Sequence, residues 1–425
     1  MFSLKTIAIV LFVLMYILMI AKQDYRPYFA IGTAIIFVIL GILPIKQVYQ
    51  AIDWNVLMMI AGTAIIVDFF IDSKMPNRIA DFLLQHSKNA MWVVIYMSLF
   101  AGIVSAFIDN VATVLMIAPV GLAVCKQLGI SPVNTILAIA VSSNLQGAAT
   151  LVGDTTSIML AGYAGMDFLD FFFMHGKPGI FFAVEFGALL TIPVMMYLFR
   201  KEKHPIDKMP KTEVKAIYPT IMLLGVVITL ISASFIPNKP SITNGLICCT
   251  YAFITLIIDY IKNKDSKRIN HALVSLDFET LFLLAGLFCV IAGIKQVGVI
   301  DDVANLIASI GGNNLFLLYT IVVWGSVIFS AFIDNIPYVA TMLPILMSVS
   351  NVLGIEPYLL YFGLLSGATL GGNITPIGSS THIAAVGILK KEGYEVSFPE
   401  FMKVGVPFTL VAVIVSYIYL WLIWA

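Results

Sequence analysis

Charged residues are scarce in this chain of 425 residues, because Asp, Glu, Lys and Arg together make up only 11% of it. A soluble globular domain carries about 25% charged residues, whereas 60% of the residues here are hydrophobic. Acidic and basic residues balance to a formal net charge of zero, and the sequence has no basic patch interleaved with aromatic residues. We therefore expect no nucleic-acid partner and expect a lipid bilayer to surround much of the protein.

Cysteine is also rare, and its four occurrences lie in apolar runs: Cys125, Cys248, Cys249 and Cys289. Their spacing suggests neither a disulfide framework nor a metal site, so we expect small buried residues and no cofactor. Ser379, Ser380 and His382 are close in sequence, but no third group orients the histidine. The sequence therefore does not predict an enzyme.

Long apolar stretches dominate what is present, and many of them have the length that crosses a hydrocarbon core of about 30 Å. We predict an all-α polytopic membrane protein with about 10 transmembrane spans. The expected spans are 4–22, 28–43, 51–71, 132–165 and 178–199 in the first half, and 218–236, 242–261, 276–294, 357–389 and 400–424 in the second.

The two halves of the sequence repeat each other. The string Ser-Ala-Phe-Ile-Asp-Asn occurs at 105–110 and again at 330–335, and a shift of 225 residues aligns 105–162 with 330–387 without a gap. Chance similarity between apolar helices would not keep one register through polar and glycine positions, so we treat each half as one structural unit. The expected organisation is a first repeat at 1–199, a cytoplasmic linker at 200–217 and a second repeat at 218–425.

Two further apolar segments precede the fourth span of each half, and an Asp-Asn pair joins them. These segments are 90–107 with 110–127, and 313–332 with 335–352. Each pair forms either two full crossings or one re-entrant helical hairpin. Each repeat then has seven or five crossings, and because both numbers are odd, the second repeat lies inverted in the membrane.

The distribution of basic residues supports this topology. With the linker in the cytoplasm, nineteen of the 24 Lys and Arg residues fall on the cytoplasmic side, as the positive-inside rule requires. We expect a multi-pass protein of the cytoplasmic membrane with both termini outside. The mixed polar segments 74–87 and 298–309 predict amphipathic helices at opposite interfaces.

The Asp-Asn pairs are the first candidate site. Asp109, Asn110, Asp334 and Asn335 lie inside apolar sequence, where a carboxylate costs a few kcal/mol and is a functional candidate by default. Helix N-capping is the simpler interpretation, but serine or threonine would cap at a lower desolvation cost. We expect these four residues to bind H⁺, Na⁺ or the substrate.

The second candidate site consists of two breaks rich in glycine and polar residues, at 144–157 and 371–382, inside the fourth span of each repeat. Broken helix is tolerated in a membrane where it lines a cavity or is buried in protein, and its free backbone groups bind ions. A kink, a packing seam, a cap at Asp154 or a hydrogen-bonding role for His382 are the alternatives. The candidate residues are Asn144, Gly147, Thr150, Asp154, Thr155, Gly372, Asn373, Thr375, Ser379, Ser380, Thr381 and His382.

The strings at 107–111, 147–154, 334–337 and 372–378 resemble those of the ion transporter superfamily. The similarity is to the branch of arsenite permeases, NhaD-type Na⁺/H⁺ antiporters and the mammalian P protein, with a citrate transporter-like domain. The resemblance implies a scaffold domain and a transport domain that moves like an elevator. It also implies two opposed re-entrant hairpins, with tips at the Asp-Asn pairs, and two unwound helices that enclose the site.

The chain departs from parts of this superfamily. Dicarboxylate symporters carry Ser-Asn-Thr at the hairpin tips, whereas aspartate replaces the serine here, and Val111 or Ile336 replaces the threonine. Many relatives follow Gly-Asp with Pro-Pro-Asn, whereas this chain has Thr-Thr-Ser at 155–157, and His382 stands where Asn is common. These differences weaken the case for a dicarboxylate and favour cation handling.

We therefore predict a secondary active transporter, coupled to H⁺ or Na⁺, that moves a small inorganic or organic anion by alternating access. An Na⁺/H⁺ antiporter is the alternative, and a passive ion channel fits less well because two half-site breaks favour an occluded centre. The expected partners are the transported ion, the coupling H⁺ or Na⁺, the bilayer and a second copy in a homodimer. The sequence does not name the substrate.

Overall fold

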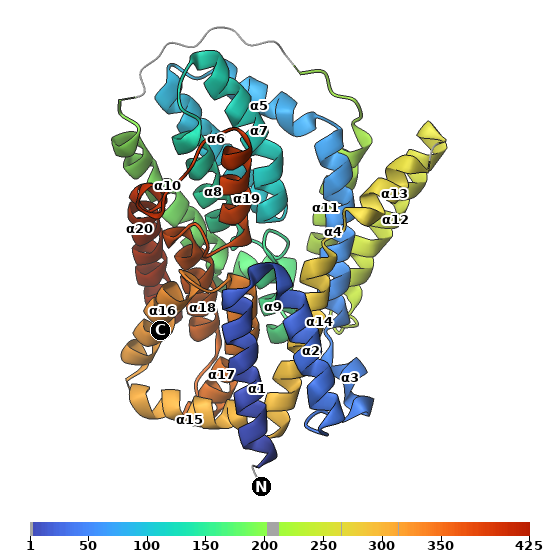
Figure 1. The fold of residues 1–425 in the computed structure, drawn as a ribbon, viewed down its shortest axis with the longest axis vertical. Helices are drawn as coiled ribbons and strands as arrows, with labels where there is room; N and C mark the ends of the chain where they lie inside the picture. The colour runs from blue at the N-terminus through green and yellow to red at the C-terminus, as the bar shows by residue number, and fades with distance from the viewer. Residues whose placement is uncertain (1–2, 202–211, 265, 313) are drawn as a thin grey trace.

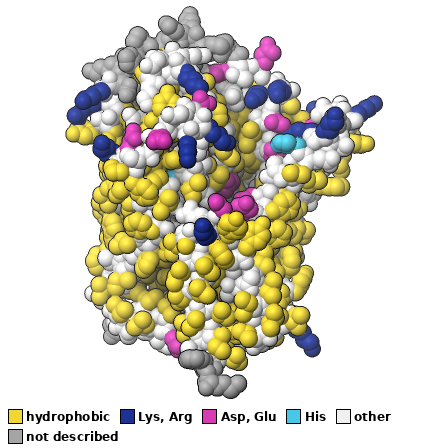
Figure 2. Space-filling model, in the orientation of Figure 1, with side chains coloured by type: hydrophobic (Ala, Val, Ile, Leu, Met, Phe, Trp, Pro, Cys, Tyr) yellow, Lys and Arg dark blue, Asp and Glu magenta, His cyan; other side chains and the backbone are white. Residues whose placement is uncertain are grey.

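The fold is all-α and polytopic, as a computed structural model of residues 3–201, 212–264, 266–312 and 314–425 shows. The central part of the expected linker, 202–211, lies outside the described residues. Eight helical stretches of the described chain are long and apolar enough to cross a membrane. Figure 2 shows hydrophobic side chains over most of one face, with charged groups gathered mainly toward its upper end.

The first repeat contributes ten helices of the described chain, two 3-10 turns and a small β-hairpin. They are α1 Leu4–Ala21, η1 Gln23–Tyr25, α2 Arg26–Ile39, α3 Ile45–Ala51, α4 Trp54–Asp72, α5 Met75–Gln85, α6 Ala90–Ser105, α7 Asn110–Leu128, α8 Val133–Gly147, α9 Thr155–Ala164, η2 Phe168–Phe171, β1 Phe173–Met174, β2 Lys177–Pro178 and α10 Ile180–Leu198.

The second repeat follows the same order of helices. They are α11 Tyr218–Ala233, α12 Thr243–Asn263, α13 Lys267–Val274, α14 Phe278–Gln296, α15 Val299–Gly311, α16 Leu315–Ser330, α17 Asn335–Leu353, α18 Tyr358–Gly371, η3 Gly372–Ile374, α19 Ser380–Lys391 and α20 Phe398–Trp424.

The helices pack into two bundles that both draw on both repeats. In the scaffold bundle, α12 packs against α4 and α14 packs against α2. In the core bundle, α6 packs against α8, α16 against α18, and α10 against α20. Figure 1 shows the core bundle on the left and the α4, α11 and α12 part of the scaffold bundle on the right. The sequence repeats are thus interleaved in space.

Small residues at equivalent positions set the spacing inside the scaffold bundle. A Cβ atom at Gly62 of α4 would lie 2.5 Å from the backbone carbon of Cys248 in α12. Its counterpart Gly286 in α14 would place a Cβ 2.7 Å from the backbone carbon of Ala30 in α2. Glycine permits this close approach of helix backbones, as is common between membrane helices.

The expected amphipathic segments are helices, α5 and α15. They lie at opposite ends of the molecule in Figure 1, α5 at the end where the chain enters and leaves 202–211, and α15 at the end where α1 begins. We name these ends the linker side and the amino-terminal side. The β-hairpin of β1 and β2 turns at His175 and Gly176, both with positive φ, and the sequence pattern did not predict it.

Candidate functional site

Each Asp-Asn pair forms the tip of a helical hairpin, where α6 turns into α7 and α16 turns into α17. The Asp109 carboxylate accepts hydrogen bonds from the backbone N–H groups of Val111 (3.0 Å) and Ala112 (3.1 Å). The Asp334 carboxylate accepts one from Ile336 (3.1 Å). Both acids therefore cap a helix. The cap occupies one oxygen of each carboxylate, and the other oxygen can take a different partner.

The two helix breaks adopt the same geometry in both repeats. The chain leaves α8 at Gly147 and enters α9 at Thr155, and it leaves α18 at Gly371 and enters α19 at Ser380. In Figure 1, α8 and α19 lie in the upper half, whereas α9 and α18 lie in the lower half, so both breaks fall near mid-height. The helix ends of both breaks therefore meet in the middle of the core bundle.

Each break is bound to the hairpin of its own repeat. The Thr150 hydroxyl donates to the carbonyl of Ala106, and the Thr375 hydroxyl donates to the carbonyl of Ala331. A Cβ at Gly153 would lie 2.6 Å from the carbonyl oxygens of Gly147 and Ser105, and Gly378 is confined in the same way by Gly372 and Ser330. Only glycine fits where these carbonyls converge.

Asn144 connects the two repeats at the centre. Its Nδ2 donates to the Thr369 carbonyl (2.7 Å) and to Asn373 Oδ1 (3.0 Å). Its Oδ1 accepts from Asn110 Nδ2 (3.1 Å) at the first hairpin tip and from the Ser379 hydroxyl (2.8 Å) in the second break. Asn144 and Asn373 are completely buried. A side chain with four partners in a low-dielectric interior holds the hairpin and both breaks in one arrangement.

Asp154 makes the reciprocal connection. It accepts from the Thr156 hydroxyl (2.9 Å) at the start of α9 and from Asn335 Nδ2 (3.4 Å) at the second hairpin tip. It also lies within electrostatic range of Asp109 and Asp334. The structure therefore gathers three of the predicted carboxylates, two from the hairpins and one from the first break, around the centre of the core bundle.

Arg26 contacts the second hairpin tip, although the sequence analysis did not select it. Arg26 is the first residue of α2. Its guanidinium contacts Asp334 Oδ2 at 2.7 Å, and the Ser380 hydroxyl donates to the same oxygen at 2.8 Å. The side chains of Arg26 and Asp334 are 12% and 3% exposed, so water screens the pair little. The positive-inside pattern treated Arg26 as an interfacial residue, and no local motif signalled a partner 308 residues away.

The other predicted residues are buried around this centre. His382 is completely buried against Phe401, and neither ring nitrogen has a partner in the described residues. The Thr381 hydroxyl is likewise unpartnered there, and Thr155 is 6% exposed. Gly147 and Gly372 border the two breaks. An unpaired polar group inside a membrane protein is costly, so His382 and Thr381 are available to a ligand or to water.

Sodium ligation at the hairpin tips remains a prediction. In the described residues, no three His, Cys, Asp or Glu side chains form a metal-like cluster. Sodium accepts carbonyl, hydroxyl and amide oxygens as well, and the converging carbonyls of the breaks are such oxygens. The donor set is therefore compatible with Na⁺ or H⁺.

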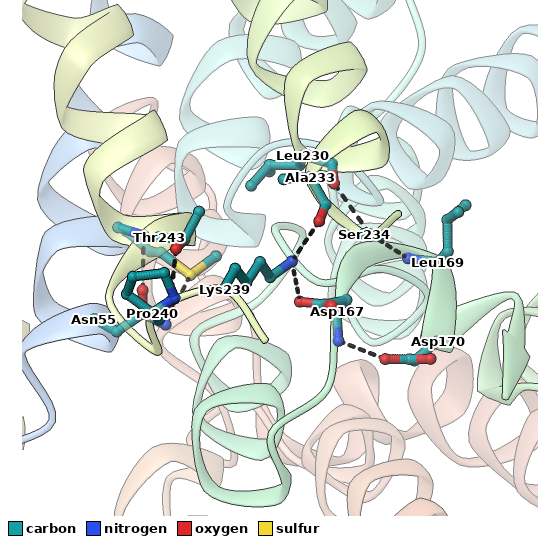
Figure 3. A network of polar contacts seen from close by, with 12 residues as sticks. Asn55, Asp167, Leu169, Asp170, Leu230, Ala233, Ser234, Lys239, Pro240 and Thr243 are labelled. Atoms are coloured by element: carbon teal, nitrogen blue, oxygen red, sulfur yellow. Dashed lines mark hydrogen bonds and ion pairs between the residues drawn. The ribbon is translucent and has the colours of Figure 1, made fainter. Parts of the chain in front are cut away.

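A cavity of about 1030 Å³ lies between the two bundles on the amino-terminal side, bordered by Asp53 of α4, Gly162 of α9 and the loop between α11 and α12. Figure 3 shows the polar network at its wall. Lys239 contacts Asp167 at 2.6 Å and donates to the carbonyl of Ala233 at 2.9 Å. This network joins a scaffold loop to the segment that follows α9.

Solved structures share this fold. The YdaH transporter of Alcanivorax borkumensis superposes with a TM-score of 0.58 at 13% identity, covering 88% of this chain and 86% of the transporter. MtrF of Neisseria gonorrhoeae, described as one of a class of antimetabolite efflux pumps, gives a TM-score of 0.60 at 15% identity, over 92% and 84% of the two chains. At such identities the likeness shows the architecture of a membrane transporter and does not extend to substrate.

Sequence relatives identify the family. An uncharacterized transporter of Mycobacterium tuberculosis is 30% identical over 430 residues, covering 99% of this chain and 98% of the relative. The P protein of Homo sapiens is 25% identical over 459 residues, 88% of this chain and 54% of that protein. The family model described as "Citrate transporter" matches residues 14–365. These matches confirm the resemblance seen in the hairpin and break motifs, and the chain belongs to the citrate transporter family.

Proposed function

We propose that this transporter is a secondary active carrier that moves a small anion together with H⁺ or Na⁺ across the cytoplasmic membrane by alternating access. The observation that carries the proposal is the polar centre in which both hairpin tips meet both helix breaks. Asn144 binds Asn373 and Ser379 of the second repeat's break, and Asp154 binds Asn335 of the second hairpin. Such a centre at the repeat interface is where secondary transporters bind substrate.

The charges at the centre favour an anion moved with a cation. Asp109, Asp154 and Asp334 supply negative charge there, and Arg26 supplies positive charge next to Asp334. A guanidinium fits the planar oxygens of a carboxylate or oxyanion. A cation that neutralises one of these carboxylates would lower the electrostatic cost of bringing in an anion, which couples the two ligands.

Alternating access is supported by a difference between the repeats at the bundle interface. A Cβ at Gly162 in α9 would lie 2.7 Å from Asp53 Oδ2 of α4, whereas its repeat counterpart Gly387 in α19 has no non-local atom within 4 Å. Similarly, α17 packs against α14, but within the described residues α7 makes no comparable contact with α4. The bundles therefore touch at Gly162 and Asp53, beside the cavity on the amino-terminal side, and are apart at the equivalent positions on the linker side.

The alternative, an Na⁺/H⁺ antiporter, is favoured by the three central carboxylates, because two cations that compete for one acid would exchange. The test is transport by purified protein in liposomes with imposed Na⁺ and pH gradients, using arsenite, citrate, succinate and ²²Na⁺ as probes. Uptake of an anion driven by either gradient supports the proposal. Sodium flux driven by a pH gradient, without uptake of any anion, supports the antiporter instead.

Binding measurements separate the same alternatives. Calorimetric titration of the transported anion at two Na⁺ concentrations and two pH values reports the coupling, because linkage between two sites is reciprocal. Tighter anion binding at higher Na⁺ or lower pH fits symport. Affinity that responds to neither ion contradicts coupled transport, and a uniporter or channel would then explain the protein better.

A further inference from the structure

Arg26 and Lys239 lie in corresponding connections of the two repeats, between the first and the second helix of each. Arg26 lies where the turn after α1 enters α2, and Lys239 lies in the connection between α11 and α12. Both belong to the scaffold bundle, and both form an ion pair with the core bundle or the segment that follows it. Each of them therefore joins the scaffold bundle to the core bundle, or to the segment that follows α9, through an ion pair.

Their partners are not equivalent. Arg26 binds Asp334 at the tip of the second hairpin. The repeat counterpart of Asp334 is Asp109, but Lys239 binds Asp167, beyond α9, instead (Figure 3). In the described residues, Asp109 accepts hydrogen bonds from backbone N–H groups alone.

The charged groups whose electrostatic influence reaches Asp109 include two further carboxylates. Asp277, the N-cap of α14 in the scaffold, and Asp154 in the first break both lie within electrostatic range of Asp109. In the described residues, an ion pair thus joins a scaffold base to the second hairpin tip, and no ion pair joins one to the first. The local geometry of the two hairpins and breaks is otherwise the same, so the difference arises from the position of the core bundle against the scaffold.

We propose that Arg26 and Lys239 are alternating counter-ions of the two hairpin tips. In the opposite conformation, Lys239 leaves Asp167 and pairs with Asp109, whereas Arg26 leaves Asp334. The residue that stands at the position of Asp167 in the second repeat is Glu392, 225 residues later, and it follows α19 as Asp167 follows α9. Glu392 is therefore the partner that Arg26 gains. The inference rests on the alternating access proposed above.

The exchange keeps both basic residues paired in both conformations, which avoids the cost of leaving a charge unpaired in a low-dielectric environment. It also leaves one hairpin-tip carboxylate without a basic partner in each conformation. That carboxylate is the one that a coupling cation neutralises. The cation therefore binds Asp109 in one conformation and Asp334 in the other.

Asp167 and Glu392 provide a matched pair of variants outside the polar centre. Asp167→Asn removes a pairing that exists only in the described conformation, and Glu392→Gln removes one that forms only in the opposite conformation. Glu392 also contacts Lys126 at 2.6 Å, but that pair is exposed and contributes little. We expect Asp167→Asn to raise, and Glu392→Gln to lower, the population of the opposite conformation by about fivefold, the equivalent of about 1 kcal/mol.

The populations are measured by the distance between spin labels in purified protein reconstituted in lipid. Labels at Gln50 and Tyr163, which border the cavity from the two bundles, report separation on the amino-terminal side. Labels at Ser241 and Phe107 report the approach of the Lys239 loop to the first hairpin tip. We expect the second distance to shorten in the population in which the first lengthens.

The outcomes distinguish a failure of the counter-ion exchange from a failure of alternating access. If the distance between Gln50 and Tyr163 has two populations but the two variants shift them in the same direction, or Ser241 and Phe107 never approach, then the counter-ion exchange is wrong and alternating access stands. If that first distance has a single value in the wild type and in both variants, while transport proceeds, then alternating access between these bundles is itself wrong.

Discussion

Replacement of Gly162 or of its repeat counterpart Gly387 by alanine should shift the protein between its two conformations in opposite directions. In the described structure, a Cβ at Gly162 would lie 2.7 Å from both Asp53 Oδ2 and Val56 Cγ2, closer than real Cβ contacts, so the bundles must separate or distort. Overpacking of this kind costs about 1–3 kcal/mol. Gly162→Ala should therefore disfavour this conformation by about 5–150-fold.

Gly387 offers the matched control. No non-local atom lies within 4 Å of a Cβ built there, so alanine is tolerated in the described conformation. In the opposite conformation, the repeat relation brings Gly387 against Asp277 and Thr280, the counterparts of Asp53 and Val56, and alanine should then clash. Both substitutions replace a helical glycine and gain the same helix propensity, about 0.5–1 kcal/mol, so the comparison cancels that effect.

The assay is the reaction rate of a single cysteine at Met159 with a membrane-impermeant maleimide. Met159 is 2% exposed and borders the cavity on the amino-terminal side. Gly162→Ala should speed labelling, Gly387→Ala should slow it, and both should slow transport, because each traps one conformation. Equal labelling rates in the two variants, or the reverse order, would refute the reasoning.

Three other perturbations test the centre and the topology. Asp109→Asn and Asp334→Asn should each leave a folded, inserted protein that has lost coupled transport, because each removes a carboxylate from the polar centre; wild-type transport rates in liposomes would reduce both residues to helix caps. Asn144→Ala should lower the free energy of unfolding by about 2 kcal/mol, the sum of several interhelical hydrogen bonds in a membrane protein, measured by thermal unfolding. The control is the replacement by alanine of a serine whose hydroxyl bonds only within its own helix. If that replacement lowers the free energy of unfolding by as much, the connecting role of Asn144 is contradicted. Single cysteines at Lys215 and Ser241 should label only from the cytoplasm and only from outside, respectively; labelling from the same side would exclude the proposed inverted topology.

Much of the architecture could be predicted from the sequence because charged residues and helix-breaking residues raise the free energy of a span inside a membrane. An aspartate in an apolar run, or a cluster of glycines in a span, persists only where the fold satisfies it. The Asp-Asn pairs and the two breaks therefore indicate, from sequence alone, where the hairpin tips and the interrupted helices lie. Asp109 and Asp334 also cap helices, as the simpler interpretation held, and a cap is a local property that sequence spacing reveals.

The connections across the centre were not predictable in the same way. Asn144 and Asp154 were expected at the site, but their partners Asn373 and Asn335 come from the other repeat and become neighbours only when the bundles assemble. Arg26 illustrates the limit. Basic residues near the end of a span are usually interfacial, and only the depth of the turn between α1 and α2 brings this one to Asp334.

The sequence by itself determined that this is a polytopic transporter of two equivalent halves, with acids and helix breaks at matched positions, because burial in a bilayer constrains each residue separately. Only the tertiary structure decided at which repeat the core bundle contacts the scaffold bundle and at which repeat the two bundles are apart. Gly162 and Gly387 have the same place in the repeat, yet one is confined and the other is free. Which glycine is confined depends on the relative position of the two bundles. Both repeats are able to make the same contacts, so the free-energy difference between the two arrangements is small, and no single residue type encodes it locally.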